Sequence, residues 1–573
     1  MPTFSARRPA LMLASITNRS IVVGVFFGLL LGVGLLLVRD YGVSWDEPNN
    51  HLNGLVNLKY VASLVLPAEQ MQHFPAAATT PDIRNFPDAH HGPIFEISAI
   101  LLSYLFTDHD SRSYYLMRHS LVFSVFVLGV WALYRLGTQR FQDWRWGLLG
   151  AGLLVLSPRF FAEASYNGKD IVYMAFFTLA MLTLLRLLAR PTWRRAALHG
   201  LATALVVDVR VQGLQLLLFT LLGLLLELRY NVAVRLPVRR FGQLMGVYAG
   251  AVAVGVVAGW PYLWAWSVPE LLAVTSHAVR YPWGFTNFYL GQQLLAIQLP
   301  WHYIPVWMLV TIPAPYSLAA GLGLVAGLRA WWLAGPGHYL RTINGRLDVL
   351  LALWLLAPLA VVTTTHVVVY EGWRHLYYIY PALLLWAVRG CQLLVRQARQ
   401  HSGRRLAARA IVGLAVFETG HTVVRMVHLH PHGNVYFSFL PGPTAERLFE
   451  RDYWGLAYRQ GLEWILAHDS APAITVNVFW HYPLYNNALI LKPAQRARLR
   501  YTPDSTARYY LAGYRWHPQS YLDSLGAEVH VIRAGGVKVL SVFRQGPGKP
   551  ARNVRPPRNS IDPQTVSPAA RLW

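Results

Sequence analysis

The sequence predicts an all-α membrane protein of about eleven transmembrane helices with a small C-terminal α/β domain. Hydrophobic residues make up 54% of the 573 residues and charged residues only 14%, whereas globular proteins carry about 25% charged residues. The hydrophobic residues form long blocks, such as 21–38 and 214–226, rather than alternating with polar ones. Arginines are concentrated in every second connection between these blocks. Together these features are typical of a multi-pass membrane protein.

The first hydrophobic block, residues 20–38, is predicted to be an uncleaved membrane span. Arg7, Arg8 and Arg19 precede it, and Arg39 follows it directly. A cleavable signal usually has an apolar core of about 7–15 residues, and this block is longer. The positive-inside rule then places the N-terminus in the cytoplasm, with the chain in the inner (plasma) membrane.

Ten further hydrophobic blocks complete the predicted bundle. They lie at residues 114–134, 147–162, 170–189, 197–209, 212–228, 242–261, 302–328, 347–368, 374–393 and 408–428. Those at 147–162 and 197–209 are short for a bilayer core, which takes about 20 residues. The arginine-rich connections, such as 229–240 and 389–409, all fall on one side of this bundle, which the positive-inside rule makes cytoplasmic. An odd number of spans places every residue after 429 on the extracytoplasmic side.

Three long segments on the predicted outer side divide the chain into domains. The loops 39–113 and 262–301 belong to a membrane domain over residues 1–428, and residues 429–546 are expected to form an extracytoplasmic α/β domain. Within the first loop, the apolar stretch 93–106 is too short to span a bilayer and predicts a helix at the membrane interface.

Patterns of hydrophobic residues predict the elements of the C-terminal domain. Residues 450–468 are amphipathic as in a helix, and strand-like runs lie at 474–480, 509–514 and 537–543. The tail at 547–573 is rich in Pro and Arg and is expected to be disordered.

Composition excludes several classes of protein. The single cysteine, Cys391, rules out an internal disulfide and any metal or redox site built on cysteines. In a soluble protein a net charge of +24 would suggest a nucleic-acid partner. Here most of that charge belongs to the predicted cytoplasmic arginines, so no nucleic-acid partner is expected.

Charged and histidine residues also gather on the predicted outer side. Ionisable residues at membrane depth are costly and commonly mark function. The outer-side candidates are Asp46, Glu47, His90, His91, Lys169, Asp170, His277, Arg280, Arg374 and His375. Each has an ordinary structural explanation, such as helix capping or anchoring at the membrane interface. Their convergence nevertheless favours a site, because the positive-inside rule would place the basic residues on the other side.

This set of residues suits the transfer of a sugar from a polyprenyl phosphate. The phosphate is already a good leaving group, so one carboxylate is needed to position or deprotonate the acceptor, and cations are needed to stabilise the departing phosphate. We expect Asp46 to act on the acceptor, with Glu47 or Asp170 orienting it or helping to hold a metal ion. The expected phosphate-binding residues are Arg374, His375, Arg280, Lys169 and His91.

Short motifs in residues 20–430 resemble those of the GT-C superfamily of glycosyltransferases, in particular the protein O-mannosyltransferases, the lipid A aminoarabinose transferase and their bacterial homologues. The matching segments, in order, are Asp46-Glu47, His91-Gly92-Pro93, Asp170, His277 to Arg280 and Arg374 to Pro381. The resemblance implies an inverting hexosyl or pentosyl transferase with a polyprenyl-phosphate sugar as donor and Asp46 as the base. The sugar and the acceptor, whether protein, lipid or glycan, stay open.

A divalent cation is a further open question. Mg²⁺, Mn²⁺ and Zn²⁺ all remain possible, since no spacing among the candidate ligands is diagnostic. The candidate ligands are His277, His90, Asp46 and Asp170.

The alternative functional class is a lipid or solute transporter or flippase. Such a protein needs charged residues along a path inside its spans and usually contains inverted repeats. The sequence shows no repeat, and Asp208 and Arg210, between two short predicted spans, are the main charges that fit such a path.

Overall fold

The structure is a computed structural model. It describes residues 7–72, 78–108, 110–231, 236–270, 284–365, 367–400, 402–478, 481–502, 507–515, 518–521 and 525–545. Two predicted site residues, His277 and Arg280, and the predicted tail at 547–573 lie outside these ranges.

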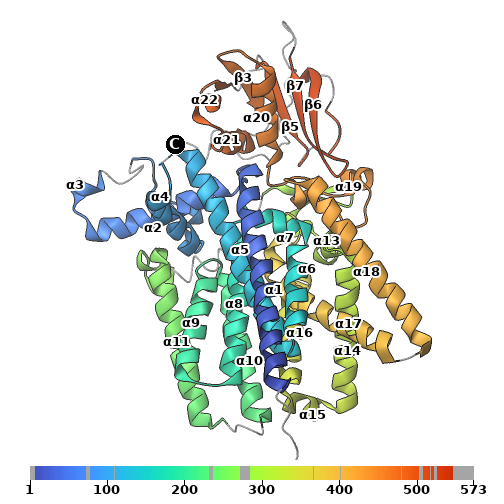
Figure 1. Cartoon of the computed structure of the whole chain (residues 1–573). Helices are drawn as coiled ribbons and strands as arrows, with labels where there is room; N and C mark the ends of the chain where they lie inside the picture. The colour runs from blue at the N-terminus through green and yellow to red at the C-terminus, as the bar shows by residue number, and fades with distance from the viewer. Residues whose placement is uncertain are drawn as a thin grey trace, which may run out of the picture.

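Helices make up most of the described chain, and the long ones form a bundle (Figure 1). The α-helices are α1 (Arg7–Leu37), α2 (Glu47–Val65), α3 (Ala68–Met71), α4 (Ile94–Phe106), α5 (Ser111–Phe141), α6 (Trp144–Val155), α7 (Pro158–Glu163), α8 (Asp170–Ala189), α9 (Trp193–Val207), α10 (Gln215–Tyr230), α11 (Val238–Gly259), α13 (Tyr303–Thr311), α14 (Ala314–Ala334), α15 (Pro336–Arg341), α16 (Ile343–Thr365), α17 (Tyr380–Gln400), α18 (Ser402–Leu429), α19 (Gly442–Leu448), α20 (Ala457–His468), α21 (His481–Ala488) and α22 (Pro493–Arg496). A 3-10 turn, η6 (Arg374–Ile379), leads directly into α17.

Nine helical segments of the described residues are long and apolar enough to cross a membrane. They are Asn18–Asp40, Ser111–Phe141, Asp170–Ala189, Val211–Tyr230, Val238–Gly259, Ala314–Ala334, Ile343–Thr365, Arg374–Arg399 and Arg405–Leu429. The predicted multi-pass helical bundle is confirmed, although the expected count of about eleven spans exceeds these nine segments. The apolar stretch predicted at 93–106 is the shorter helix α4.

Two short helices account for the difference in number. Helices α6 and α9, at the predicted spans 147–162 and 197–209, contain 12 and 15 residues. A bilayer core takes about 20 helical residues, so neither is long enough alone. Both still pack within the bundle, α6 against α5 and α9 against α8 and α11.

The predicted span 302–328 is divided into α13 and α14. Helix α13 ends at Thr311, and Ile312 has extended backbone. Pro313 follows, and proline both lacks the N–H that would continue the helix and disfavours helical backbone in the residue before it.

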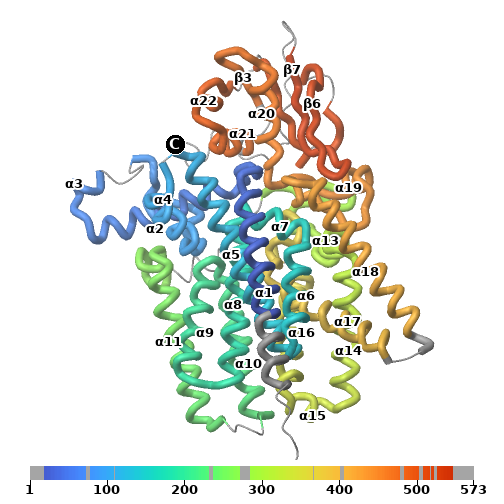
Figure 2. The backbone as a smooth tube through the Cα atoms, in the orientation of Figure 1, coloured from blue at the N-terminus to red at the C-terminus, as the bar shows by residue number. Residues whose placement is uncertain are grey.

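Glycine allows α14 and α17 to lie in close contact. A Cβ atom at Gly323 would lie 2.0 Å from the carbonyl oxygen of Trp386, and one at Gly390 would lie 2.0 Å from that of Ala319. Small residues at such positions let membrane helices approach closely. Helix α18, in contrast, lies at the outer edge of the bundle (Figure 2), where only 6% of its hydrophobic window is buried.

The C-terminal part of the chain forms a five-stranded mixed sheet in the order β4-β3-β5-β7-β6. The strands are β3 (Ile474–Val478), β4 (Leu499–Tyr501), β5 (Tyr509–Gly513), β6 (Ala527–Ala534) and β7 (Val537–Arg544). Strand β3 runs parallel to β4 and β5, whereas β7 runs antiparallel to β5 and β6. The strands predicted at 474–480, 509–514 and 537–543 are confirmed, and the helix predicted at 450–468 begins only at Ala457. A separate hairpin pairs β1 (Thr286–Tyr289) with β2 (Gln292–Leu295).

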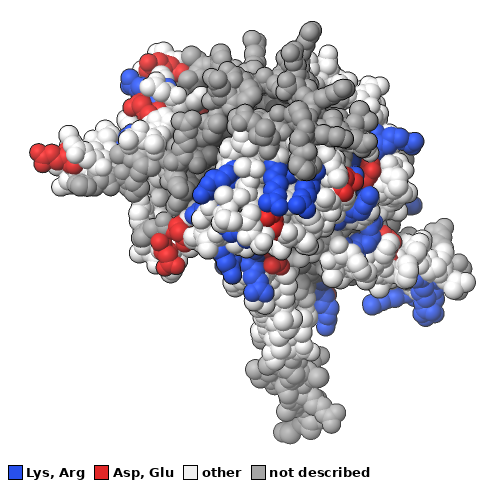
Figure 3. Space-filling model, turned by 90° about the horizontal axis from the view of Figure 1, so that it is seen from above, with Lys and Arg blue, Asp and Glu red and all other residues white. Residues whose placement is uncertain are grey.

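The sheet lies at one end of the bundle, which we call the sheet end (Figure 1). It is joined to the bundle by hydrogen bonds: Ser111 Oγ donates to the Leu489 carbonyl at 2.8 Å, and Arg459 donates to the Tyr41 carbonyl at 2.7 Å. Viewed from above, acidic and basic side chains are both present on this end of the molecule (Figure 3). The contacts hold the C-terminal domain against the first loop of the membrane domain.

Candidate functional site

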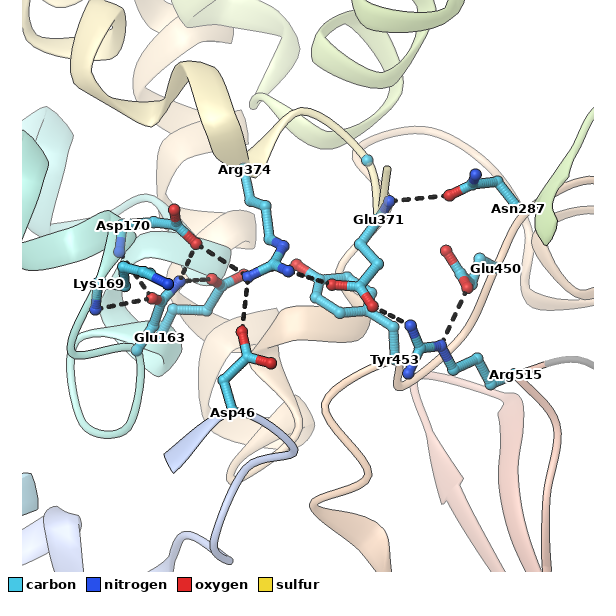
Figure 4. Close-up of polar contacts among 12 residues, drawn as sticks. Asp46, Glu163, Lys169, Asp170, Asn287, Glu371, Arg374, Glu450, Tyr453 and Arg515 are labelled. Atoms are coloured by element: carbon cyan, nitrogen blue, oxygen red, sulfur yellow. Dashed lines mark hydrogen bonds and ion pairs between the residues drawn. The ribbon is translucent and has the colours of Figure 1, made fainter. Parts of the chain in front are cut away.

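Arg374 is the centre of an ionic cluster at the sheet end. Its guanidinium lies 3.0 Å from Asp46, 3.3 Å from Asp170 and 2.6 Å from Glu371. Figure 4 shows it between the two aspartates on one side and Glu371 on the other. The Cζ atom of Arg374 also lies over the Trp454 ring, 4.8 Å from its centre, a geometry that favours a cation. Arg374 is therefore held in one position from several sides.

Asp170 is the first residue of α8, where a carboxylate interacts favourably with the helix dipole. Asn167 accepts the Asp170 backbone N–H at 2.8 Å and donates its side-chain amide to the carboxylate at 3.1 Å. The carboxylate pairs with Arg374 and, on its other oxygen, with Arg210. Asp170 thus links two arginines at the mouth of a membrane span.

Among the three carboxylates on Arg374, Asp46 is the accessible one. The side chain of Asp46 is 32% exposed, against 1% for Asp170 and 5% for Glu371. It stands just before α2 and does not cap that helix with its side chain. An external molecule can therefore reach Asp46, whereas Asp170 and Glu371 act as internal counter-charges.

Further cationic and imidazole groups surround this cluster. Burial lowers the pKa of the half-buried Lys169 to about 8, with the nearby positive charge of Arg210 acting in the same direction. Burial, and then the charge of Lys169, hold the pKa of His91 well below its ordinary value. Arg210 and His375 also lower the pKa of His91. The structure therefore brings together Arg374, His375, Lys169 and His91, four of the predicted phosphate-binding residues.

Three nitrogen atoms of this region are buried without a hydrogen-bond partner in the part of the chain that the structure describes. They are Nε of Arg374, Nε of Arg210 and Nδ1 of His375. An unpartnered buried polar atom costs about 1–3 kcal/mol. Their grouping at one site indicates polar atoms available to an incoming ligand.

Glu47 lies apart from the Arg374 cluster, although it is adjacent to Asp46 in sequence. Its carboxylate is buried and pairs with Arg118 at 2.7 Å and with His119 at 2.9 Å, and it accepts the Ser44 N–H at 2.6 Å. Burial opposes its charge, but His119 and Arg118 outweigh that effect and lower its pKa. Arg118 also binds Glu96 of α4 at 2.6 Å. This network joins the first loop to α4 and α5.

The C-terminal domain supplies a cation to the site from the segment after β5. Arg515 pairs with Glu371 and lies 3.4 Å from Glu450 (Figure 4). Burial lowers the pKa of Arg515 to about 9 and raises that of Glu450 to about 8. Glu371 has a left-handed backbone, with φ of 58°, and its N–H is accepted by Asn287 at 3.0 Å. Arg515 thus stabilises a residue whose backbone is unusual for a non-glycine side chain.

A further buried carboxylate, Glu163, is linked to Asp170 through the side-chain amide of Asn167. It accepts hydrogen bonds from Asn167 and Tyr377 at 2.8 Å each and from Tyr453 at 3.1 Å. Burial nevertheless raises the pKa of Glu163. Tyr453 also belongs to the C-terminal domain, so that domain supplies one of the hydrogen bonds that stabilise Glu163.

The best candidate metal ligands are Asp88, His90 and His91, whose ligand atoms lie within 4.8 Å of one another. The Nδ1 atom of His90 is hydrogen-bonded to the Pro87 carbonyl at 2.7 Å, so Nε2 is the ring nitrogen that would coordinate a metal. Such a hydrogen bond to the second ring nitrogen is typical of metal-binding histidines. The other predicted ligands differ: Asp46 and Asp170 face arginines, and His277 lies outside the described residues.

Several residues of the site were not predicted from the sequence. They are Arg210, Arg515, Glu163, Tyr453 and Asp88. Asp208 and Arg210 are visible in the sequence as charged residues between two short predicted spans. That position fits a translocation path and gives no sign of the contact between Arg210 and Asp170. No local signal identifies Arg515, which lies far from Glu371 along the chain.

The fold and the site define this chain as a multi-pass membrane protein with a buried ionic site at one end of its helical bundle. No protein-family model matches the chain, and no protein of curated function matches it. Similar solved structures include ArnT from Cupriavidus metallidurans bound to undecaprenyl phosphate, with 10% identity and a TM-score of 0.47 over 91% of this chain and 98% of that chain.

A second similar structure is the oligosaccharyltransferase of Archaeoglobus fulgidus in its apo form, with 11% identity, a TM-score of 0.45 and coverage of 82% of this chain. The present chain spans only 64% of the length of that enzyme. The archaeal enzyme AglB, in complex with an inhibitory peptide and a dolichol-phosphate, gives 11% identity and a TM-score of 0.45 over 85% of this chain and 69% of that chain. ArnT and AglB belong to the GT-C class that the sequence motifs resemble.

Proposed function

We propose that this chain is an inverting glycosyltransferase that moves a sugar from a polyprenyl phosphate to an acceptor at the sheet end of the bundle. The observation that carries the proposal is the contact between Asp46 and Arg374. A carboxylate that solvent reaches lies 3.0 Å from a buried guanidinium, and further cationic and imidazole groups surround the pair. The site thus combines a group that can accept a proton with groups that can hold a phosphate.

The proposed reaction is a single displacement at the anomeric carbon. The acceptor oxygen forms a bond to that carbon while the bond from the carbon to the phosphate oxygen breaks, and the phosphate leaves with the electron pair. Asp46 takes the proton of the acceptor. Because attack occurs opposite the leaving phosphate, one displacement inverts the anomeric configuration.

The phosphate is proposed to bind beside Asp46 at Lys169, Arg210 and His375. Arg210 and His375 offer the buried, unpartnered nitrogen atoms described above, and fixed donors of this kind stabilise developing negative charge. His91 lies near the same groups. Asp170 is assigned a positioning role, since it holds Arg374 and Arg210 in place.

We also propose that Asp88, His90 and His91 hold a divalent cation, with Zn²⁺ the best fit. Two imidazoles and a carboxylate are common zinc ligands, and three protein ligands leave a coordination position open. A cation there would add positive charge next to the phosphate. Zinc bound by the purified protein should fall from about one ion per chain to near zero in a His90→Ala/His91→Ala variant. Equal zinc content in both proteins would contradict the assignment.

The sheet end is proposed to face the extracytoplasmic side of the inner (plasma) membrane. Among the arginines of the predicted cytoplasmic connections, Arg140 lies in the last turn of α5, Arg190 directly follows α8, and Arg346 lies in the first turn of α16, all at the end of the bundle opposite the site. The positive-inside rule favours this orientation. In sealed right-side-out vesicles, a tag at the N-terminus should be protected from added protease. Cleavage of that tag would show the opposite orientation.

The transporter alternative is less well supported by the contacts. Arg210, which suggested a path through the bundle, is instead paired with Asp170 at the site. The two classes can be separated with purified protein in vesicles containing radiolabelled undecaprenyl-phosphate mannose and glucose. We expect release of undecaprenyl phosphate from one of these donors when a membrane extract is supplied as acceptor. Movement of the intact lipid across the bilayer without cleavage would favour a flippase.

A further inference from the structure

A cavity of about 550 Å³ lies at the end of the bundle opposite the site. It is bounded by the last turns of α5 and α8 and the first turns of α9 and α16. Helix α8 extends from Asp170 at the site to Ala189 at this cavity, a distance of roughly 30 Å at 1.5 Å per residue. The cavity is therefore separate from the ionic cluster described above.

Four arginines line this cavity: Arg135, Arg186, Arg190 and Arg195. Within the described part of the chain, no ion pair joins any of them to a carboxylate at 4 Å or less. Arg195 donates to the Arg186 carbonyl at 2.7 Å, and Arg135 lies 5.7 Å from the centre of the Trp131 ring. These contacts orient the Arg195 and Arg135 side chains without neutralising their charge.

Neighbouring arginines at the same end are neutralised. Arg140 and Arg389 share Asp348, with Arg140 at 2.5 Å from its carboxylate, and Arg346 lies 2.6 Å from Glu227. The positive-inside rule explains why arginines occur at this end. It does not explain why four of them converge on one cavity whose described lining contains no Asp or Glu.

We propose that this cavity binds a phosphate-bearing anion, either the headgroup of a lipid or a free phosphate. Guanidinium groups bind phosphate through paired hydrogen bonds, and basic pockets between membrane helices bind anionic headgroups. The starts of α9 and α16 add the positive ends of two helix dipoles. Gln139 and Asn344 provide amide donors on the cavity wall. The volume falls in the range of about 300–1,000 Å³ that is usual for ligand sites.

The test uses the full-length purified protein in neutral detergent. Native mass spectrometry measures retention of cardiolipin and phosphatidylglycerol, with phosphatidylcholine as the zwitterionic control. Thermal unfolding with added inorganic phosphate or pyrophosphate measures binding of the free anion. The variant is Arg186→Gln/Arg195→Gln, and Arg194→Gln is the matched control, because Arg194 is exposed on the same helix and does not line the cavity.

Because each basic residue near an anionic lipid surface contributes about fivefold to binding, we expect the double variant to lose at least about tenfold in affinity. Arg194→Gln should bind as wild type does, and Arg186→Lys/Arg195→Lys should retain most of the binding and show that the cavity still folds. If cardiolipin is retained and inorganic phosphate leaves Tm unchanged, the ligand of the cavity is a lipid headgroup. If inorganic phosphate raises Tm, the ligand is the free anion. The proposal is overturned if the double variant binds as tightly as wild type, if Arg194→Gln loses as much, or if none of these anions binds.

Discussion

Arg515 of the C-terminal domain pairs with Glu371, and Glu371 in turn lies 2.6 Å from Arg374. The contact joins the five-stranded sheet to the ionic cluster of the membrane domain (Figure 4). Without Arg515, Glu371 would have Arg374 as its main counter-charge and would draw it away from Asp46. The C-terminal domain is thus part of the site and not an independent appendage.

Replacing Arg515 should therefore impair transfer. We expect Arg515→Gln to lower the rate of sugar transfer at least about tenfold and to destabilise the fold, since removing one partner of a buried ion pair costs about 3–5 kcal/mol. Transfer assays and thermal unfolding measure the two effects. The control is Arg500→Gln, because Arg500 is exposed on β4 of the same domain. Wild-type transfer by Arg515→Gln would show that the contact has no role in the site.

Glu47 and Asp46 should respond differently to the loss of charge. Glu47 is buried between Arg118 and His119, so Glu47→Gln should destabilise the fold by about 3–5 kcal/mol. Asp46 is partly exposed, so Asp46→Asn should cost about 1 kcal/mol or less. Thermal unfolding in detergent compares the two variants. If both unfold at the same temperature, the separation of the two carboxylates into different networks is wrong.

Donor binding should weaken in alkaline solution because of Lys169. Burial lowers the pKa of Lys169 to about 8, so its positive charge is present below that pH and is lost as the pH rises through it. Between pH 7 and pH 9 the charged fraction then falls about tenfold, and affinity for undecaprenyl phosphate should fall by up to that factor. A Lys169→Arg variant keeps its charge and should lose this dependence. An identical decline in both proteins would assign the effect to another group.

The sequence predicts the helices and strands better than the contacts between them. Long apolar blocks and alternating runs indicate α5, α8, β3 and β7, because those patterns repeat within a few residues. The break at Pro313 also has a local cause. It falls inside an otherwise continuous apolar block, however, so the sequence predicts one span where the structure has two helices.

The composition of the site is only partly visible in the sequence. Asp46, Lys169, Asp170 and Arg374 stand out because they are charged residues next to apolar blocks. The pairing of Arg515 with Glu371 cannot be recognised in this way, since it joins residues 144 positions apart. Glu47 shows the opposite error. Its adjacency to Asp46 in the sequence suggests that the two carboxylates share a site, but the Glu47 side chain pairs with Arg118 instead.

The central proposal is that Asp46 accepts the proton of the acceptor. The most direct measurement compares wild type and Asp46→Asn for two quantities, the binding of undecaprenyl phosphate and the transfer of sugar from the donor that wild type cleaves. The proposed mechanism predicts that Asp46→Asn binds the lipid phosphate at least as well as wild type, since a negative charge is removed, while transfer falls by about 100-fold or more, the range that general-base catalysis supplies. Transfer at the wild-type rate by Asp46→Asn would contradict it.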